Sequence, residues 1–118
     1  MIHNFRDLDV WKKSMALTSA VYVVTRSFPQ YEAYGLCSQM QRAATSIPSN
    51  IAEGSGRFSD KELSHFLNIS LGSAYELETE LLVAFSAQYL SQKQCDEIRQ
   101  QIVEVQKMLY ALIRKYNV

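Results

Sequence analysis

The amino-acid sequence predicts an all-α protein, an antiparallel up-down-up-down four-helix bundle with a proline-kinked second helix. Apolar residues recur three and four positions apart over four long stretches, which is the spacing of amphipathic helices. The chain has only two prolines and four glycines, so long helices can run with few interruptions. Short connections between the stretches favour antiparallel neighbours. A chain of 118 residues has the size of one domain, so we expect residues 1–118 to form a single bundle.

The first helix is predicted from about Asp7 to Phe28. Asp7 or Asp9 can cap its start, and Pro29 ends it because the residue before a proline is disfavoured in helical conformation. The run at 21–24 is rich in β-branched residues and could form a strand, but no second strand candidate exists to pair with it. The apolar positions of this helix include Val10, Leu17, Val21, Val24 and Phe28.

The second helix is predicted over about residues 32–52 and contains Pro48. A proline inside a helix leaves the carbonyl four residues earlier, that of Ala44, without its usual donor, at a cost of roughly 3 kcal/mol. Small residues surround Pro48, so a neighbouring helix can approach closely and offset this cost. Asn50 and Ser46 could satisfy carbonyls that the proline frees.

The third helix has the clearest start signal. Ser59 followed by Glu62 forms a capping box, and Phe58 before the cap can pack on Leu63 as a hydrophobic staple. From there the apolar spacing continues to about Gln88, which gives a helix roughly 45 Å long at 1.5 Å per residue.

The fourth helix repeats the capping device, with Ser91 as the cap and Gln94 at the box position. Its apolar residues alternate steps of three and four, as along a heptad seam. They are Cys95, Ile98, Ile102, Val105, Leu109, Leu112 and Tyr116.

Helices three and four carry more apolar residues than one seam requires. This surplus indicates either a wide core stripe or a second apolar face, and we expect a face that buries against another copy of the chain. The residues outside the seams are Ile69, Leu71, Tyr75, Leu82, Val83, Phe85, Val103, Met108, Tyr110 and Ile113.

Charge and composition limit the function classes. The 12 basic and 12 acidic residues give a formal net charge of zero, so a chain-wide basic footprint for nucleic acid is absent. The first 57 residues hold six basic and four acidic side chains, which allows either a localised basic surface or ordinary solvated faces. The two cysteines are too few for a disulfide framework, and the longest apolar run is too short to span a membrane. We therefore expect a cytoplasmic protein.

No arrangement of residues predicts an enzyme, a metal site or a cofactor. Glu62 and His65 match half of a di-metal motif once, but Glu62 already serves the capping box. Cys37 and Cys95 have no histidine nearby in the sequence. Residues 54–57, Gly-Ser-Gly-Arg, lack the lysine of a phosphate-binding loop, and we interpret them as a turn with anion binding as the alternative.

Three glutamates cluster on the third helix. Glu76 and Glu80 share a face at a spacing of four, where like charges repel, and Glu78 points elsewhere. An arginine from another helix, with Arg42 the leading candidate, would turn this pair into a polar cross-link.

Aromatic and basic residues alternate near the N-terminus. Phe5 and Arg6 with Trp11, Lys12 and Lys13 form the best candidate for a single-strand binding platform. The alternative is that Trp11 belongs to the core.

Five segments carry a resemblance to a known family, and they are residues 5–13, 34–36, 42–54, 66–67 and 71–79. Together they resemble the four-helix-bundle proteins encoded in intervening sequences of bacterial 23S ribosomal RNA genes. The resemblance implies a non-enzymatic, ring-forming homo-oligomer, with a pentamer favoured. Relatives that serve diversity-generating retroelements resemble pentamers that bind nucleic acid and a reverse transcriptase through a basic surface. As structural signature residues it indicates Pro48, Asn50, Glu53, Gly54 and Glu76.

The leading functional hypothesis is a homo-oligomeric adaptor that engages RNA or a nucleic-acid-processing protein. The alternative is a protein-interaction scaffold without a nucleic-acid role. Neither hypothesis involves a membrane or a small-molecule substrate. The candidate nucleic-acid contacts are Arg6, Lys12, Lys13, Arg42 and Arg57.

Overall fold

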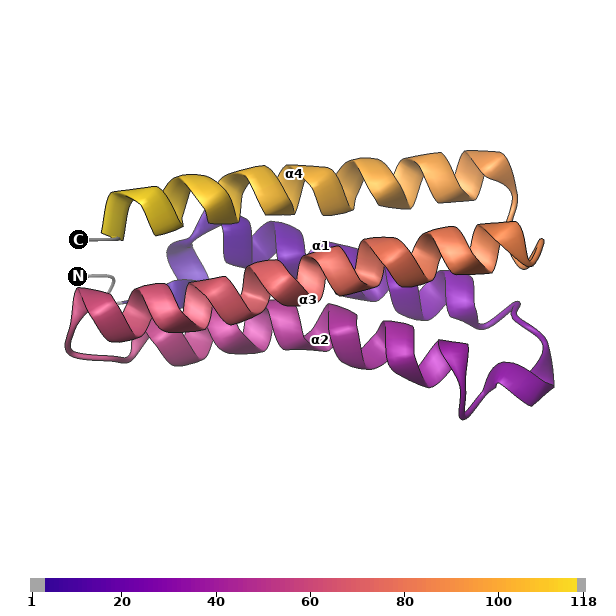
Figure 1. The fold of residues 1–118 in the computed structure, drawn as a ribbon, viewed down its shortest axis with the longest axis horizontal. Helices are drawn as coiled ribbons and strands as arrows, with labels where there is room; N and C mark the ends of the chain where they lie inside the picture. The colour runs from indigo at the N-terminus through magenta and orange to yellow at the C-terminus, as the bar shows by residue number, and fades with distance from the viewer. Residues whose placement is uncertain (1–3, 117–118) are drawn as a thin grey trace.

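Four helices lie side by side and alternate in direction in the computed structural model, which describes residues 4–116 (Figure 1). The bundle measures 44 × 23 × 21 Å. The described part of the chain contains no strand, so the predicted up-down-up-down bundle is confirmed. The helices are α1 (Asp9–Thr25), α2 (Leu36–Ser55), α3 (Asp60–Ser86) and α4 (Gln92–Tyr116), with short 3-10 turns η1 (Phe5–Asp7) and η2 (Gln30–Glu32).

Helix α1 is shorter than predicted at both ends. It begins after Leu8, whose extended backbone precedes the helix without a side-chain cap, because Asp7 belongs to the separate turn η1. The predicted cap by Asp7 or Asp9 is therefore wrong, and Asp9 instead lies in the first turn, where a negative charge complements the helix dipole. The helix ends at Thr25, and Phe28 reaches the core from the following loop.

Helix α2 begins at Leu36, four residues after the predicted start at Glu32. Glu32 ends the turn η2, and its Oε1 accepts a hydrogen bond from the backbone N–H of Leu36 at 3.2 Å. The side chain expected inside the helix thus satisfies one of the free donors at its start. The helix passes through Pro48 without interruption and continues to Ser55, three residues beyond the predicted end at Ala52.

Ser59 and Ser91 cap the starts of α3 and α4, as predicted. Ser59 Oγ accepts from the backbone N–H of Glu62 at 3.1 Å. Ser91 and Gln94 form the reciprocal pair, since Ser91 Oγ accepts from the Gln94 N–H at 3.1 Å and Gln94 Oε1 accepts from the Ser91 N–H at 2.9 Å. The hydrophobic staple is wrong, because the Phe58 side chain is 93% exposed. The aromatic ring therefore remains in solvent beside the cap.

The core is built from one apolar stripe per helix. Ile113, predicted to lie outside the seam, is buried, whereas Leu112 is only half-buried, so the end of α4 is rotated relative to the predicted seam. None of the helices in the described range has the length and apolar character required to cross a membrane. Fully buried core residues include Leu17, Met40, Ile47, Ile51, Leu67, Leu77, Leu81, Ile102 and Leu109.

Candidate interaction surface along helices α2 and α3

Hydrogen bonds from two neighbouring helices stabilise the backbone around Pro48. The hydroxyl of Thr18 on α1 lies 3.1 Å from the Ala44 carbonyl oxygen, which Pro48 leaves without its helical donor. Ser70 on α3 donates to the Ile47 carbonyl at 2.9 Å. Sequence reasoning missed both donors, because nothing in the spacing of α1 or α3 shows which carbonyl of α2 their hydroxyls will face.

Asn50 contributes a third hydrogen bond from within α2. Its Nδ2 donates to the Ser46 carbonyl at 2.9 Å and lies 3.0 Å from Ser46 Oγ. The Ser46 hydroxyl in turn lies 2.8 Å from that of Ser73 on α3. The expectation that Asn50 and Ser46 satisfy carbonyls freed by the proline is wrong, because Asn50 binds the Ser46 carbonyl, Ser46 Oγ contacts Asn50 and Ser73, and the freed Ala44 carbonyl is bound by Thr18.

Gly54 allows α2 and α3 to approach closely. A Cβ atom at this position would lie 2.8 Å from Phe66 Cβ and 3.2 Å from Leu63 Cδ1. Contacts of that length require one of the helices to move, so only glycine fits this packing. Gly54 therefore lies inside the helix as a packing residue, and the helix end falls beyond it, with Gly56 as the C-cap.

Arg57 follows α2, and its guanidinium already contacts two neighbouring side chains. Its guanidinium pairs with the Glu53 carboxylate one turn earlier and lies 4.7 Å from the centre of the Phe66 ring. These contacts fix Arg57 against the start of α3. The turn predicted over residues 54–57 is therefore shorter than expected, because Gly54 and Ser55 belong to α2 and only Gly56 and Arg57 lie outside it.

An open polar cleft of about 570 Å³ lies between α2 and α3 toward the start of α2. Its walls combine a guanidinium, a carboxylate, a phenol, three hydroxyls and an amide. The lining residues are Tyr34, Gly35, Ser38, Gln39, Arg42, Ala43, Ser46, Ser73 and Glu76. Among the described residues, no ion pair within 4.0 Å joins Arg42 to Glu76 or Glu80, so the predicted polar cross-link is not formed.

Glu80 is buried beside Glu76. Its side chain is 8% exposed, and Oε1 has no hydrogen-bond partner. Two effects raise the pKa of Glu80 to about 7. The larger is burial, which disfavours the charged form, and the second is repulsion from the nearby Glu76 carboxylate. At neutral pH this carboxyl group is therefore divided between its protonated and ionised forms.

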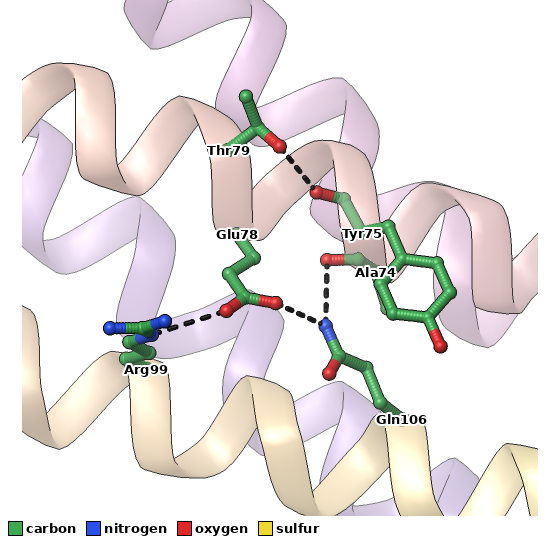
Figure 2. Close-up of polar contacts among 6 residues, drawn as sticks. All are labelled: Ala74, Tyr75, Glu78, Thr79, Arg99 and Gln106. Atoms are coloured by element: carbon green, nitrogen blue, oxygen red, sulfur yellow. Dashed lines mark hydrogen bonds and ion pairs between the residues drawn. The ribbon is translucent and has the colours of Figure 1, made fainter.

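Glu78 forms the polar cross-link that was expected of its neighbours (Figure 2). Its carboxylate accepts from Arg99 Nε at 3.1 Å and from Gln106 Nε2 at 2.8 Å, so it joins α3 to α4. Gln106 Nε2 also lies 3.5 Å from the Ala74 carbonyl oxygen. The prediction that Glu78 points away from Glu76 and Glu80 agrees with this arrangement.

Four of the five candidate nucleic-acid contacts lie toward one end of the bundle. Arg6 in η1 and Arg57 after α2 lie toward the end where the α2–α3 connection lies (Figure 1). Lys12 and Lys13 at the start of α1 lie further in, because Lys13 pairs with Glu104 in the middle of α4. Arg42 lies apart from them, because Ser55 at the end of α2 is 13 positions further along, roughly 20 Å along the helix.

The three basic residues near the N-terminus differ in the contacts they form. Lys13 pairs with Glu104 of α4 at 2.6 Å, and this pairing raises the pKa of Lys13. Arg6 lies over the Phe5 ring at 4.5 Å, and Phe5 packs edge-to-face on the half-buried Trp11. Trp11 thus packs against the core, as the alternative interpretation expected, while Arg6 and Lys12 remain exposed.

Comparison with known proteins identifies a family and solved structures of similar fold. A family model described as 23S rRNA-intervening sequence protein matches residues 6–111. A crystal structure from Bacteroides thetaiotaomicron VPI-5482, described as a protein of unknown function from the S23 ribosomal protein family, is 26% identical with a TM-score of 0.80. The match covers 88% of this chain and 97% of that one. No curated protein matches.

Proposed function

This chain belongs to the 23S rRNA-intervening sequence protein family, and we propose on that basis that it is a non-enzymatic adaptor that assembles with copies of itself and engages RNA. A nucleic-acid-processing protein is the second partner expected for the assembly. The observation that carries the RNA proposal is the gathering of basic side chains at one end of the bundle.

Arg6 and Lys12 are the principal phosphate contacts in this proposal. Both are exposed, and among the described residues neither forms an ion pair, whereas Lys13 and Arg57 already pair with glutamates. Arg114 and Lys115 in the last turn of α4 add two exposed cations at the same end. Because the chain as a whole is neutral, RNA affinity has to come from this local group of charges.

Exposed apolar side chains support the assembly of several copies. Val83 on α3 is 51% exposed and Val23 on α1 is 58% exposed, in a bundle that already has a complete core. A contiguous exposed apolar area commonly marks a contact with another protein. Because α1 and α3 do not contact each other, the proposed contact rests on the apolar residues of α3. Further large apolar residues with exposed side chains are Met15, Tyr22, Ile69, Tyr75, Leu82, Phe85 and Tyr110.

Salt-dependent RNA binding tests the proposal. The affinity of a fluorescein-labelled RNA hairpin is measured by anisotropy over a series of salt concentrations. We expect the variant with Arg6→Ala and Lys12→Ala to bind more weakly and to reduce the slope of log affinity against log salt by about 2, or about 1 for each phosphate contact. The control removes two charges at the opposite end with Arg26→Ala and Lys93→Ala, and it should bind like the parent protein.

The neutral charge favours a second candidate, a scaffold that binds proteins only. In that case the parent protein would fail to retain the hairpin even at low salt. Affinity purification from nuclease-treated cells would still recover the same partner proteins. Equal losses in the two double variants would also contradict the RNA proposal, because binding would then not depend on the basic end.

A further inference from the structure

The cleft between α2 and α3 has a composition that none of the assigned roles explains. Arg42 and Glu76 are exposed on opposite walls without an ion pair within 4.0 Å among the described residues. Tyr34 at the edge is 100% exposed and makes no contact that would explain an aromatic residue there. A volume of about 570 Å³ falls within the range of small-ligand sites.

The α3 wall of the cleft is formed by Ser73 and Glu76. The Ser73 hydroxyl already lies 2.8 Å from that of Ser46, whereas the exposed Glu76 carboxylate forms no ion pair within 4.0 Å in the described part of the chain. This carboxylate is therefore open to N–H donors from a ligand. Two adjacent N–H donors match a carboxylate best, because they bind both of its oxygens at once.

The α2 wall has the opposite chemistry. Arg42 offers a planar guanidinium suited to a phosphate, and Tyr34 offers an aromatic face on which a base can stack. Gln39 and the hydroxyl of Ser38 lie between them and can bind further polar atoms of a nucleotide. A ligand that uses both walls therefore carries an anion, a flat ring and adjacent N–H donors.

We propose that this cleft binds a guanine nucleotide of single-stranded RNA, with the base against Tyr34 and Glu76 and a phosphate at Arg42. Guanine is the RNA base whose Watson–Crick edge presents two adjacent donors, N1–H and the N2 amino group, to one carboxylate. Unstacked bases in single strands are read by proteins at this edge. The inference rests on the proposed RNA-binding function and gives Arg42, which lies apart from the basic end, a role of its own.

Base substitution in the RNA tests the proposal. The probe is a labelled oligouridine that carries one guanosine, compared with the same strand carrying inosine, which lacks the N2 amino group, or adenosine. We expect the guanosine strand to bind about tenfold more tightly than either of the others, as one bidentate contact provides. Glu76→Gln should remove this preference, and Glu97→Gln, an exposed carboxylate of α4, should retain it.

Arg42→Ala should weaken all three strands equally and reduce the salt slope by about 1, whereas Arg26→Ala should not. Thermal unfolding of each variant separates a local effect from loss of the fold, which is not expected because Arg42 and Glu76 are exposed.

Three outcomes overturn the inference. These are equal affinity for guanosine and inosine strands, an unchanged preference in Glu76→Gln, or displacement of the guanosine strand by free arginine methyl ester but not by 5′-GMP. The last result would show that the cleft holds a cationic side chain of a protein partner. A titration with 5′-GMP alone separates the two proposals. If the protein binds GMP through Glu76 but does not bind the hairpin, only the proposed RNA function is contradicted. If it binds the hairpin without preferring guanine, only this inference is contradicted.

Discussion

At the scale of single residues, Glu80 makes stability depend on pH. Its pKa rises from an ordinary 4.5 to about 7 in the folded protein, because the side chain is buried beside Glu76. Between these two values the folded state keeps a proton that the unfolded state releases, so the unfolding free energy falls as pH rises through this window. Below about pH 4.5 the contribution is fully present, and above pH 7 it is lost.

The variant Glu80→Gln tests this pH dependence, because glutamine cannot ionise. We expect this variant to unfold at a temperature roughly 5 °C higher than the parent at pH 8, with little difference at pH 4.5. Thermal denaturation followed by circular dichroism at both pH values measures the effect. Exposed Glu97→Gln serves as the control, and a gain for Glu80→Gln that is equal at both pH values would contradict the explanation.

Thr18 and Pro48 give a second prediction at this scale. The Thr18 hydroxyl shares its proton between the Ser14 carbonyl at 2.8 Å and the Ala44 carbonyl at 3.1 Å. We expect Thr18→Val to cost about 1 kcal/mol of unfolding free energy in the parent protein. In a Pro48→Ala background it should cost less, because the new backbone N–H can then bond to Ala44. Urea denaturation of the four proteins of this double-mutant cycle gives the coupling, and a coupling of zero would mean that the hydroxyl does not replace the missing donor.

At the scale of helices, two glycines should respond oppositely to alanine. A Cβ at Gly54 meets Phe66 Cβ at 2.8 Å, whereas a Cβ at Gly72 meets no atom within 4 Å. Gly54→Ala should therefore destabilise the protein by about 1–3 kcal/mol through overpacking. Gly72→Ala should stabilise it by about 0.5–1 kcal/mol, because alanine is the better helix former. Chemical denaturation compares them, and similar effects of the two changes would contradict close packing at Gly54.

Helix starts were predictable where their signal is local. Ser59 and Ser91 were found because the bonded groups lie three residues apart in the sequence. The start of α2 was missed because Glu32 supports it from a preceding turn, as an acceptor outside the helix. The Phe58 staple failed although its spacing was correct, because only the packed structure determines whether the ring finds a surface.

At the scale of the whole molecule, the bundle topology explains which site residues come together. Arg6 and Arg57 are far apart in sequence, and the antiparallel order of the helices brings them to one end (Figure 1). The order of helices was predictable, so this gathering could have been derived. Arg99, and not Arg42, pairs with Glu78 of the glutamate cluster. This pairing depends on how α4 is rotated against α3, and the periodicity of the sequence does not determine that rotation.

We expect the protein to self-associate, because apolar residues such as Val83 and Val23 stay exposed although the core is complete. Light scattering coupled to size-exclusion chromatography, performed on nuclease-treated protein over a dilution series, measures the mass directly. We expect a discrete species at a multiple of the 13.5 kDa chain mass. A constant mass of 13.5 kDa at every concentration would contradict it.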